Sequence, residues 1–469
     1  MSKSISTTTH IFMAADARHF TVPDAEPNAN VWTLRYKILF DQDPEFWSYR
    51  ANQQLQAYAS TIEQTVPNVQ VHRIPAPFAD SIYVADPLQT VAQIFFRVTD
   101  NGSVEVDTSK SRISTVLSHF GLQSREHEVA IFANALADAI IRGDVPATLT
   151  EGAILRNEAI ESHTRHEGNG NNYPDPFRGI LWVAEGSRFS AENPKEIEGR
   201  TGLISKPLRV KEDYYHVDTL MMVLGGGHLA VLPSAFRDES AYTDFLKTAF
   251  PDGKGGINEH EKENYLIEIP ETLRDSFIMN TSCIGNNVFM PYNNPAGRMI
   301  LYYKQNIEAL ERERGSLGAD EHIPVETFFR EYQAGIEEIE HLFASQNKTL
   351  PSEEIVSELK GLLNVETLPA TQDDAVPGLR SMSMVQKVVA EYEAFRTFAA
   401  LLEEKGYHPT TIPMDALILG GGGTHCTINI DLQKIYPNWR EVFDWAKHPS
   451  KNWRAVLEED RYVEQWMGR

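Results

Sequence analysis

A cysteine follows the most glycine-rich stretch of the chain. Residues 415–430 read DALILGGGGTHCTINI, so that Cys426 lies three residues after a run of four glycines. A thiolate is a nucleophile, and glycines allow the backbone to approach a substrate closely. The ordinary alternative is a small apolar residue packed behind a tight turn. One cysteine does not decide between these interpretations, so acid/base partners must be sought elsewhere in the chain.

Further side chains with acid/base chemistry occur at turns and strand ends. His216 and Asp218 lie two residues apart in YYHVDTLMMVL. A strand there would point both side chains to the same face of a sheet. Glu167 in RHEGNGNNY and Asp86 in DSIYVADPLQ are carboxylates of the same kind, each beside a turn or strand end. Taken singly, each is as readily explained as an ordinary surface group.

In chain order, these five residues are Asp86, Glu167, His216, Asp218 and Cys426. Together they resemble the guanidino-group modifying superfamily, which contains arginine deiminase, agmatine deiminase, dimethylarginine dimethylaminohydrolase and the glycine amidinotransferases. The resemblance runs from about residue 9 to residue 430, apart from an insertion. HVDT and GGGGTHCTIN are specific in combination, and HIFMAADARHFTV, FADSIYVADP, HEGNG and GSRFSAEN gain weight from their order. There are departures. Gly170 stands where many members carry an acid, and Thr427 follows the cysteine one position earlier than usual.

The resemblance implies a fold and a set of roles. The fold is an α/β propeller of five ββαβ blades (a pentein) around a central pocket. Cys426 would attack the guanidine carbon, while His216, oriented by Glu167, transfers protons. Carboxylates suit a planar cation with five N–H donors, so Asp86 and Asp218 would clamp it. Arg188 in GSRF corresponds to a residue that grips the substrate carboxylate.

These roles leave several functions open. A hydrolase of deiminase type would pass a covalent thiouronium to water, and an amidinotransferase would pass it to an amine. A non-catalytic binding protein of the same fold is the third possibility. Retention of Asp218 favours an unsubstituted guanidine. No metal or organic cofactor is expected, because no Cys/His cluster has ligand spacing and no glycine loop carries a phosphate-binding lysine.

Two further residues receive no catalytic role. His425 would point to the opposite face from Cys426 if the segment were extended. Cys283, in NTSCIGNNVF, is expected to be small and buried.

The elements that must position these residues alternate between strand and helix. This alternation predicts an α/β chain. The first part of the catalytic domain spans 1–304, a charged helical insertion spans 305–384, and the last part spans 385–469. A long helix ends at Gly406, and a β pattern resumes through ALIL. The predicted strands are VQVHRI, SIYVAD, GILWVAE, TLMMVL, HLAVL, NVFMPY and RMILYY, and the predicted helices include 54–65 and 127–143.

The composition limits the classes of molecule that the protein is expected to bind. The formal net charge of −23, from 43 basic and 66 acidic residues, disfavours nucleic acid and anionic membranes and is compatible with a small cationic substrate. No apolar run approaches the roughly 20 residues of a membrane span. The first residues lack a secretory signal, and two distant cysteines do not form a disulfide framework, so a cytoplasmic location is expected. The oligomeric state is left open.

Overall fold

The structure is a computed structural model of the 469-residue chain. It describes residues 8–18, 40, 43–76, 82–120, 125–143, 160–161, 165, 167–185, 190, 192–212, 214, 216–293, 382–430 and 432–443. Apart from its last three residues, the predicted insertion at 305–384 lies outside the described residues, as do Arg188 and the predicted strand RMILYY. The division into domains therefore stays a prediction.

One arrangement of strands recurs five times among the described residues. Two antiparallel strands are followed by one or two helices and by a third strand that runs parallel to the second. The first two units are β17 (Ile428–Ile430), β1 (Thr9–Ala14), α2 (Pro44–Thr65) and β2 (Val69–Ile74), then β3 (Leu88–Gln93), β6 (Arg112–Leu117), α3 (Glu126–Ile141) and β7 (Ile160–Glu161). The third is β8 (Asn172–Asp175), β9 (Ile180–Glu185), α6 (Asn193–Thr201) and β10 (Ser205–Arg209).

The other two units follow the same plan. The fourth is β11 (Met221–Val223), β12 (Leu229–Val231), α7 (Glu239–Ala249), α8 (Glu259–Tyr265) and β13 (Leu266–Glu268). The fifth is β14 (Ser282–Ile284), β15 (Asn287–Tyr292), α12 (Met382–Glu404) and β16 (His408–Pro413). A further strand, β18 (Gln433–Ile435), pairs parallel to β3, and β4 (Phe96–Val98) and β5 (Val104–Val106) form a hairpin. The chain is therefore an α/β protein, as the alternation predicted.

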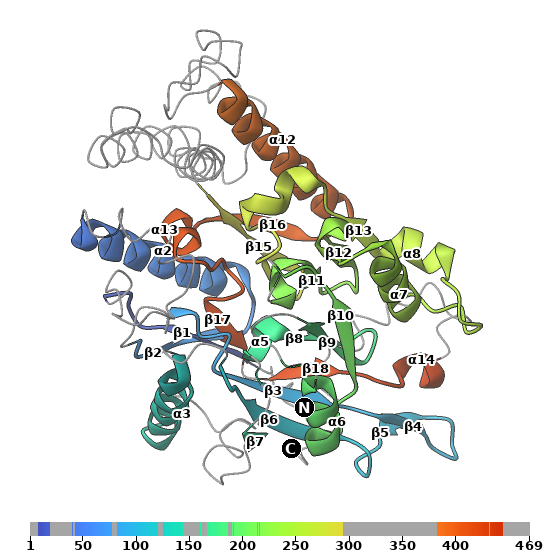
Figure 1. Cartoon of the computed structure of the whole chain (residues 1–469). Coiled ribbons are helices and arrows are strands. Elements are labelled where there is room, and N and C mark those ends of the chain that lie inside the picture. Colours follow the sequence, from blue (N-terminus) through green and yellow to red (C-terminus); the bar gives the residue numbers. More distant parts are fainter. Residues whose placement is uncertain are drawn as a thin grey trace.

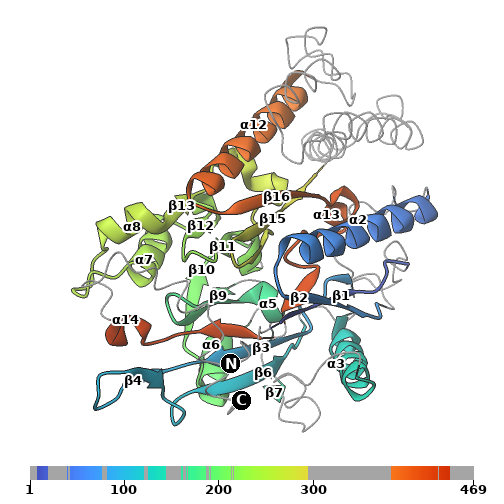
Figure 2. The ribbon, with the colours of Figure 1, turned by 180° about the vertical axis from the view of Figure 1, so that it is seen from behind.

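Helices cover the outside of the strands, and α2 shows why. In α2, the side chain of Asp43 accepts a hydrogen bond from the backbone N–H of Phe46 at 2.9 Å and caps the helix. Its buried residues, which include Trp47, Leu55, Tyr58 and Ile62, recur at helical spacing and form one face. Figures 1 and 2 show α2, α3, α7, α8 and α12 at the periphery, with the strands toward the middle.

Most predicted elements are confirmed. Strands occupy 69–74, 180–185, 221–223, 229–231 and 287–292, helices cover 54–65 and most of 127–143, and α12 ends just before Gly406. Within the described residues, no helix is long and apolar enough to cross a membrane.

Two predicted strands are wrong. ALIL belongs to the short helix α13 (Asp415–Leu419), all of which is buried. In SIYVAD, residues 82–85 are buried, but the chain turns there and the backbone N–H of Asp86 reaches the carbonyl of Tyr83 at 3.4 Å. Short apolar runs that are buried on every side carry no period that separates strand from helix or turn.

Candidate functional site

Each of the five units places a polar side chain two to five residues before its first strand. Asp86 precedes β3, Asp218 precedes β11 and Cys426 precedes β17. Asn280 holds the same position before β14, and Glu167 precedes β8 with the one-turn helix α5 (Gly168–Asn171) between them. Figure 1 shows α5, β8, β11 and β17 together near the middle of the molecule. The repeated unit thus brings together residues that are hundreds of positions apart in the chain.

His216 and Glu167 form a buried pair. Nε2 of His216 lies 2.6 Å from Oε2 of Glu167, and the two residues are 4% and 0% exposed. With the Nε2 proton donated to the carboxylate, Nδ1 is left to exchange a proton with a substrate. Burial alone would lower the pKa of His216, but Glu167, Asp86 and Asp218 outweigh it and raise that pKa. The predicted role of Glu167 in orienting His216 is compatible with this contact.

The predicted strand at His216 and Asp218 is wrong, although the two side chains do come together. His216 is extended and caps a 3-10 turn, η3 (Val217–Thr219), which carries Asp218. Nδ1 of His216 is 3.8 Å from Oδ1 of Asp218. The turn therefore brings the two side chains together, as the strand was expected to do.

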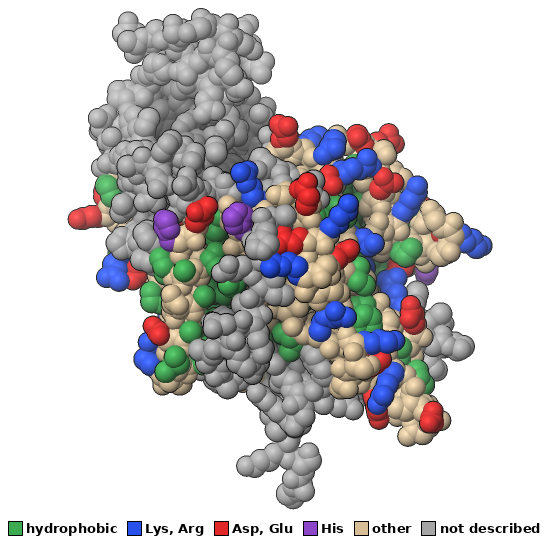
Figure 3. Space-filling model, turned by 60° about the horizontal axis from the view of Figure 1, so that its bottom comes forward, with side chains coloured by type: hydrophobic (Ala, Val, Ile, Leu, Met, Phe, Trp, Pro, Cys, Tyr) green, Lys and Arg blue, Asp and Glu red, His purple; other side chains and the backbone are tan. Residues whose placement is uncertain are grey.

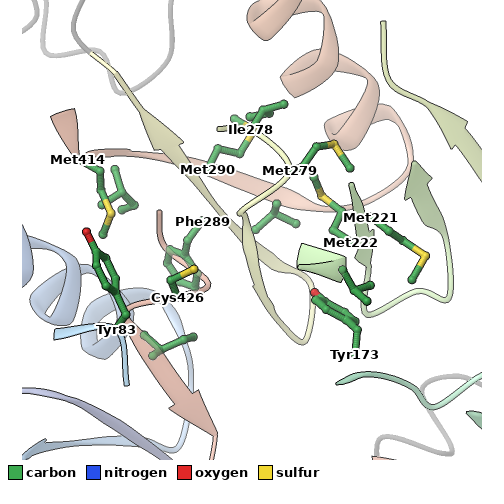
Figure 4. Close-up of a cluster of buried hydrophobic side chains, with 14 of the residues drawn as sticks. Tyr83, Tyr173, Met221, Met222, Ile278, Met279, Phe289, Met290, Met414 and Cys426 are labelled. Carbon is green, nitrogen blue, oxygen red and sulfur yellow. The ribbon is translucent and has the colours of Figure 1, made fainter. Parts of the chain in front are cut away.

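Cys426 is a buried thiol beside two carboxylates. Its Sγ donates to Oδ2 of Asp218 at 3.4 Å and accepts a hydrogen bond from Nδ2 of Asn280 at 3.0 Å. Burial, then Asp218 and Asp86, raise the pKa of this thiol, while the bond from Asn280 lowers it. Figure 4 shows Cys426 among buried hydrophobic side chains, beside Phe289 and near Tyr83. In this state, the thiol is held neutral.

Asn280 is the residue that the sequence analysis missed. Besides Cys426, its Nδ2 donates to Oδ2 of Asp218 at 2.9 Å. Its Oδ1 accepts from the backbone N–H groups of Gly423 at 2.8 Å and Cys426 at 3.1 Å. An amide offers both donors and acceptors, so one buried side chain ties the thiol, a carboxylate and the glycine loop together. Only its repeated position before a first strand could have indicated it.

The glycine loop is shaped by close packing. Gly421 has a φ of 103°, which favours glycine, and a Cβ on Gly422 would lie 2.2 Å from the ring of Tyr83. The hydroxyl of Tyr83 in turn donates to the carbonyl of Leu417 at 2.8 Å. The departure at Thr427 is structural, because its buried hydroxyl bonds back to the carbonyls of Gly423 and Thr424 at 3.2 and 3.1 Å. The loop thereby holds Cys426 in place.

The surroundings of Gly170 explain why no acid stands at this position. A Cβ at this position would lie 2.6 Å from Nδ1 of His216 and 2.9 Å from Oδ1 of Asp86. No side chain fits there while His216 keeps its present place.

Asp86 and Asp218 each have one buried carboxylate oxygen, Oδ1, with no hydrogen-bond partner among the described residues. The other oxygen of Asp86 pairs with Arg125 Nη1 at 3.0 Å. Burial raises the pKa of Asp86, whereas Arg125 and His216 lower it. Buried acceptors left open in this way suit a ligand that carries N–H donors.

The expected position of His425 is wrong. Its Nδ1 lies 2.9 Å from Oδ2 of Asp218, and its ring stacks on Tyr173 at 4.9 Å. The backbone forms a turn here and is not extended, so successive side chains do not alternate between faces. His425 also lines a cavity of about 330 Å³, together with residues of β11, β14 and β17. Cys283 lines this cavity and is partly exposed, so the expectation that it is buried is wrong too.

Asp86, Glu167 and His216 are also the one set, in the part of the chain that the structure describes, that could hold a metal ion. Each offers one ligand atom, and these atoms lie within 4.8 Å of one another. Arg125 already places a cation against two of them, 3.0 Å from Asp86 and 3.8 Å from Glu167. The expected absence of a metal stays a prediction.

No protein-family model matches this chain, and no curated protein matches it. Among solved structures, it is similar to the N-terminal domain of ArgZ bound to substrate, an arginine dihydrolase from the ornithine-ammonia cycle in cyanobacteria, with 14% identity, a TM-score of 0.48 and coverage of 91% of this chain and 99% of that one. AgrE with ornithine and NAD⁺ shares 14% identity at a TM-score of 0.47, over 91% of this chain and 40% of that chain.

A third similar structure is a dimethylarginine dimethylaminohydrolase adduct with S-methyl-L-thiocitrulline. It shares 12% identity at a TM-score of 0.43, over 90% of this chain and 100% of that chain. Because these likenesses are distant, the case for a reaction rests on the side chains of the site.

Proposed function

We propose that this protein is an enzyme that hydrolyses the terminal guanidine of an arginine-like compound through a covalent intermediate on Cys426. The observation that carries this proposal is the pair of open oxygens, on Asp86 and Asp218, in a buried site that also holds a thiol and a His–Glu pair. A guanidinium is planar, cationic and rich in N–H donors, so it would satisfy both oxygens at once.

The charge of such a substrate would also activate the nucleophile. The pKa of the Cys426 thiol is raised by burial and by Asp218 and Asp86. A bound guanidinium would offset those two carboxylates and stabilise the thiolate, so that the nucleophile forms when the substrate is in place. Asn280 supports the same state, because its N–H bond to Sγ favours the charged sulfur.

The remaining groups account for the bonds that break. The thiol proton passes to solvent as the substrate binds, and the sulfur bonds to the guanidine carbon. Protonated His216 then gives its Nδ1 proton to the departing nitrogen, which leaves as ammonia. The resulting thiouronium is cleaved when His216, now neutral, takes a proton from water that attacks the same carbon. This step releases a ureido product and restores the thiol. The raised pKa of His216 suits the first of these two tasks, since the ring must begin protonated.

The finer assignments belong to the same proposal. We infer that the five repeated units are the five blades of a closed ββαβ propeller, with the site at the ends where the first strands begin. Arg188 would hold the substrate carboxylate. An amine acceptor in place of water would make the enzyme an amidinotransferase with the same side chains.

The deciding experiment is incubation with arginine, agmatine and related guanidines, followed by assays for ammonia, the ureido product and the free amine. Ammonia and the ureido product in equal amounts are expected. Release of ornithine that depends on an added amine would indicate amidinotransfer. If the folded protein formed no product from any guanidine, the proposal would be contradicted. A non-catalytic binding protein of the same fold would then be favoured.

A further inference from the structure

A second guanidinium is already buried at the site, on Arg125. Its Nη1 donates to Oδ2 of Asp86 at 3.0 Å, while Nε and Nη2 donate to the two oxygens of Glu128 at 3.0 and 2.8 Å. The Arg125 side chain is 3% exposed and lies over the ring of Phe120, 4.5 Å from its centroid. Bidentate pairing and stacking fix the plane of this guanidinium.

The charges around Arg125 are unevenly balanced. Four buried carboxylates face this region, those of Asp86, Glu128, Glu167 and Asp218. Two cations oppose them, Arg125 and, when protonated, His216. Burial penalises the ionised form of Asp86, and Arg125 is the strongest influence in the other direction. Nη1 of Arg125 also lies 3.8 Å from Oε2 of Glu167. Burial raises the pKa of Asp86 overall, and Arg125 is the largest single influence that favours its charged form.

The same contact orients Asp86. Oδ2 is occupied by Arg125, and Oδ1 is the oxygen without a partner among the described residues. We propose that Arg125 is a positioning residue for the guanidine site: it holds Asp86 ionised by one oxygen and turns the other toward the substrate. This inference rests on the proposed function and adds a residue that acts through Asp86 without reacting itself.

Removal of Arg125 should change the pH dependence of kcat/KM. Arg125 lowers the pKa of Asp86, so its removal should raise that pKa. Asp86 would then be protonated at a higher pH than in the wild type, and a neutral carboxyl cannot clamp a cation. The acid limb of kcat/KM should therefore move to higher pH in Arg125→Met, with about a tenfold loss on that limb for each unit that the pKa moves. Part of the lost activity should return as the pH rises.

Arg178 provides a matched control. It is also a buried arginine, 3.2 Å from the acid three residues before it, Asp175, and it lies 4.8 Å from the ring centroid of Phe250. Arg178→Met removes a buried ion pair and a stacked guanidinium away from the site. If loss of a buried pair were the whole effect, both variants would lose activity equally at every pH. The double variant Arg125→Met/Glu128→Gln removes the stranded carboxylate and should recover stability without recovering the wild-type profile.

The test measures kcat and KM from pH 5.5 to 9.5 for wild type, Arg125→Met, Arg178→Met and the double variant, with methylguanidinium binding followed by calorimetry over the same range. A raised acid limb in KM and in binding, confined to the Arg125 variants, is expected. Parallel profiles for Arg125→Met and wild type would overturn the inference while leaving the function intact. A wild type that turns over no guanidine contradicts the function, and the binding titrations then still decide the role of Arg125.

Discussion

At the level of single residues, the two cysteines differ in their surroundings. Cys283 is partly exposed, donates from Sγ to the carbonyl of Gly285 at 3.2 Å and accepts from Gly225 N–H at 3.3 Å. Cys426 is buried against Asn280 and Asp218. Exposure alone would pick Cys283 for chemistry, but a nucleophile must lie beside the groups that hold the substrate and move protons.

Cys426→Ser should therefore abolish turnover and leave the thermal midpoint almost unchanged, because the hydroxyl fits the same space and is far less nucleophilic at neutral pH. Mass spectrometry of a quenched reaction should find the adduct on Cys426. Cys283→Ser is the control and should keep wild-type turnover. Appreciable activity in Cys426→Ser would rule out the covalent path.

We expect Asp218 to determine which guanidine is accepted. Its Oδ2 already takes hydrogen bonds from Asn280 at 2.9 Å and, when Nδ1 is protonated, from His425 at the same distance, which leaves Oδ1 for the substrate. A dimethylated nitrogen offers that oxygen no N–H donor. A buried charged acceptor without a partner costs about 3 kcal/mol, or roughly a hundredfold in rate.

Arginine-like guanidines with a free terminus should accordingly react at least about a hundredfold faster than asymmetric dimethylarginine, measured as kcat/KM. Asp218→Asn should slow the free guanidine most and narrow the difference between the two substrates. Comparable rates in the wild type would mean that Asp218 does not contact the terminal nitrogens.

At the level of elements, the site depends on how α13 is anchored before the glycine loop. Asp415, at the start of α13, accepts from Nε and Nη2 of Arg50 at 2.6 and 2.7 Å and from Gln54 at 2.7 Å. Arg50 and Gln54 belong to α2, so one buried ion pair joins two helices that are far apart in the chain.

Arg50→Met should lower the free energy of unfolding by about 3–5 kcal/mol, because it strands a buried carboxylate. Chemical denaturation measures this change. Arg209→Met, which breaks a pair with Asp244 whose side chains are 38% and 59% exposed, is the control and should cost less than about 1 kcal/mol. Equal effects of the two substitutions on the free energy of unfolding would contradict the role of Arg50 in anchoring α13.

The short helix α5 should be sensitive for a different reason. In Gly170→Ala, the new Cβ would lie 2.6 Å from Nδ1 of His216 and would push the ring away from its substrate. We expect kcat to fall on the order of a hundredfold, the scale of a displaced acid/base group. Gly199→Ala in α6, where a Cβ meets no atom within 4 Å, should keep full activity. A Gly170→Ala enzyme with normal kcat would show that His216 need not stay where it lies.

At the level of the whole molecule, the elements that the sequence predicts correctly are those whose residue pattern is local. The strands 180–185 and 229–231 are short β-rich runs bounded by turn residues, and α3 is a continuous helix-prone stretch, so each is predicted from its own local sequence. Asn280 and Arg125 could not be found in this way, because their roles depend on contacts that only the assembled units create. The helix at ALIL was missed because its residues are buried on every side and carry no local period.

The net charge is also a property of the whole chain. With 66 acidic and 43 basic residues, the protein carries a formal charge of −23. Figure 3 shows both signs mixed over the described part of one face, so the excess does not form a single local patch there. A field of this sign draws cations toward the protein at long range, and salt screens it over about 10 Å at 0.1 M.

Raising the salt concentration should therefore reduce kcat/KM for cationic guanidines, and a dication such as agmatine should lose more than arginine, whose net charge is +1. The reason is that screening weakens long-range attraction in proportion to the charge of the approaching molecule, while the bound guanidinium stays shielded inside a buried site. Initial rates from 10 mM to 0.5 M sodium chloride test this, with kcat as the internal control because it is measured after binding. Identical salt dependence for both substrates would mean that the excess negative charge has no part in capture, and that the buried carboxylates alone select the cation.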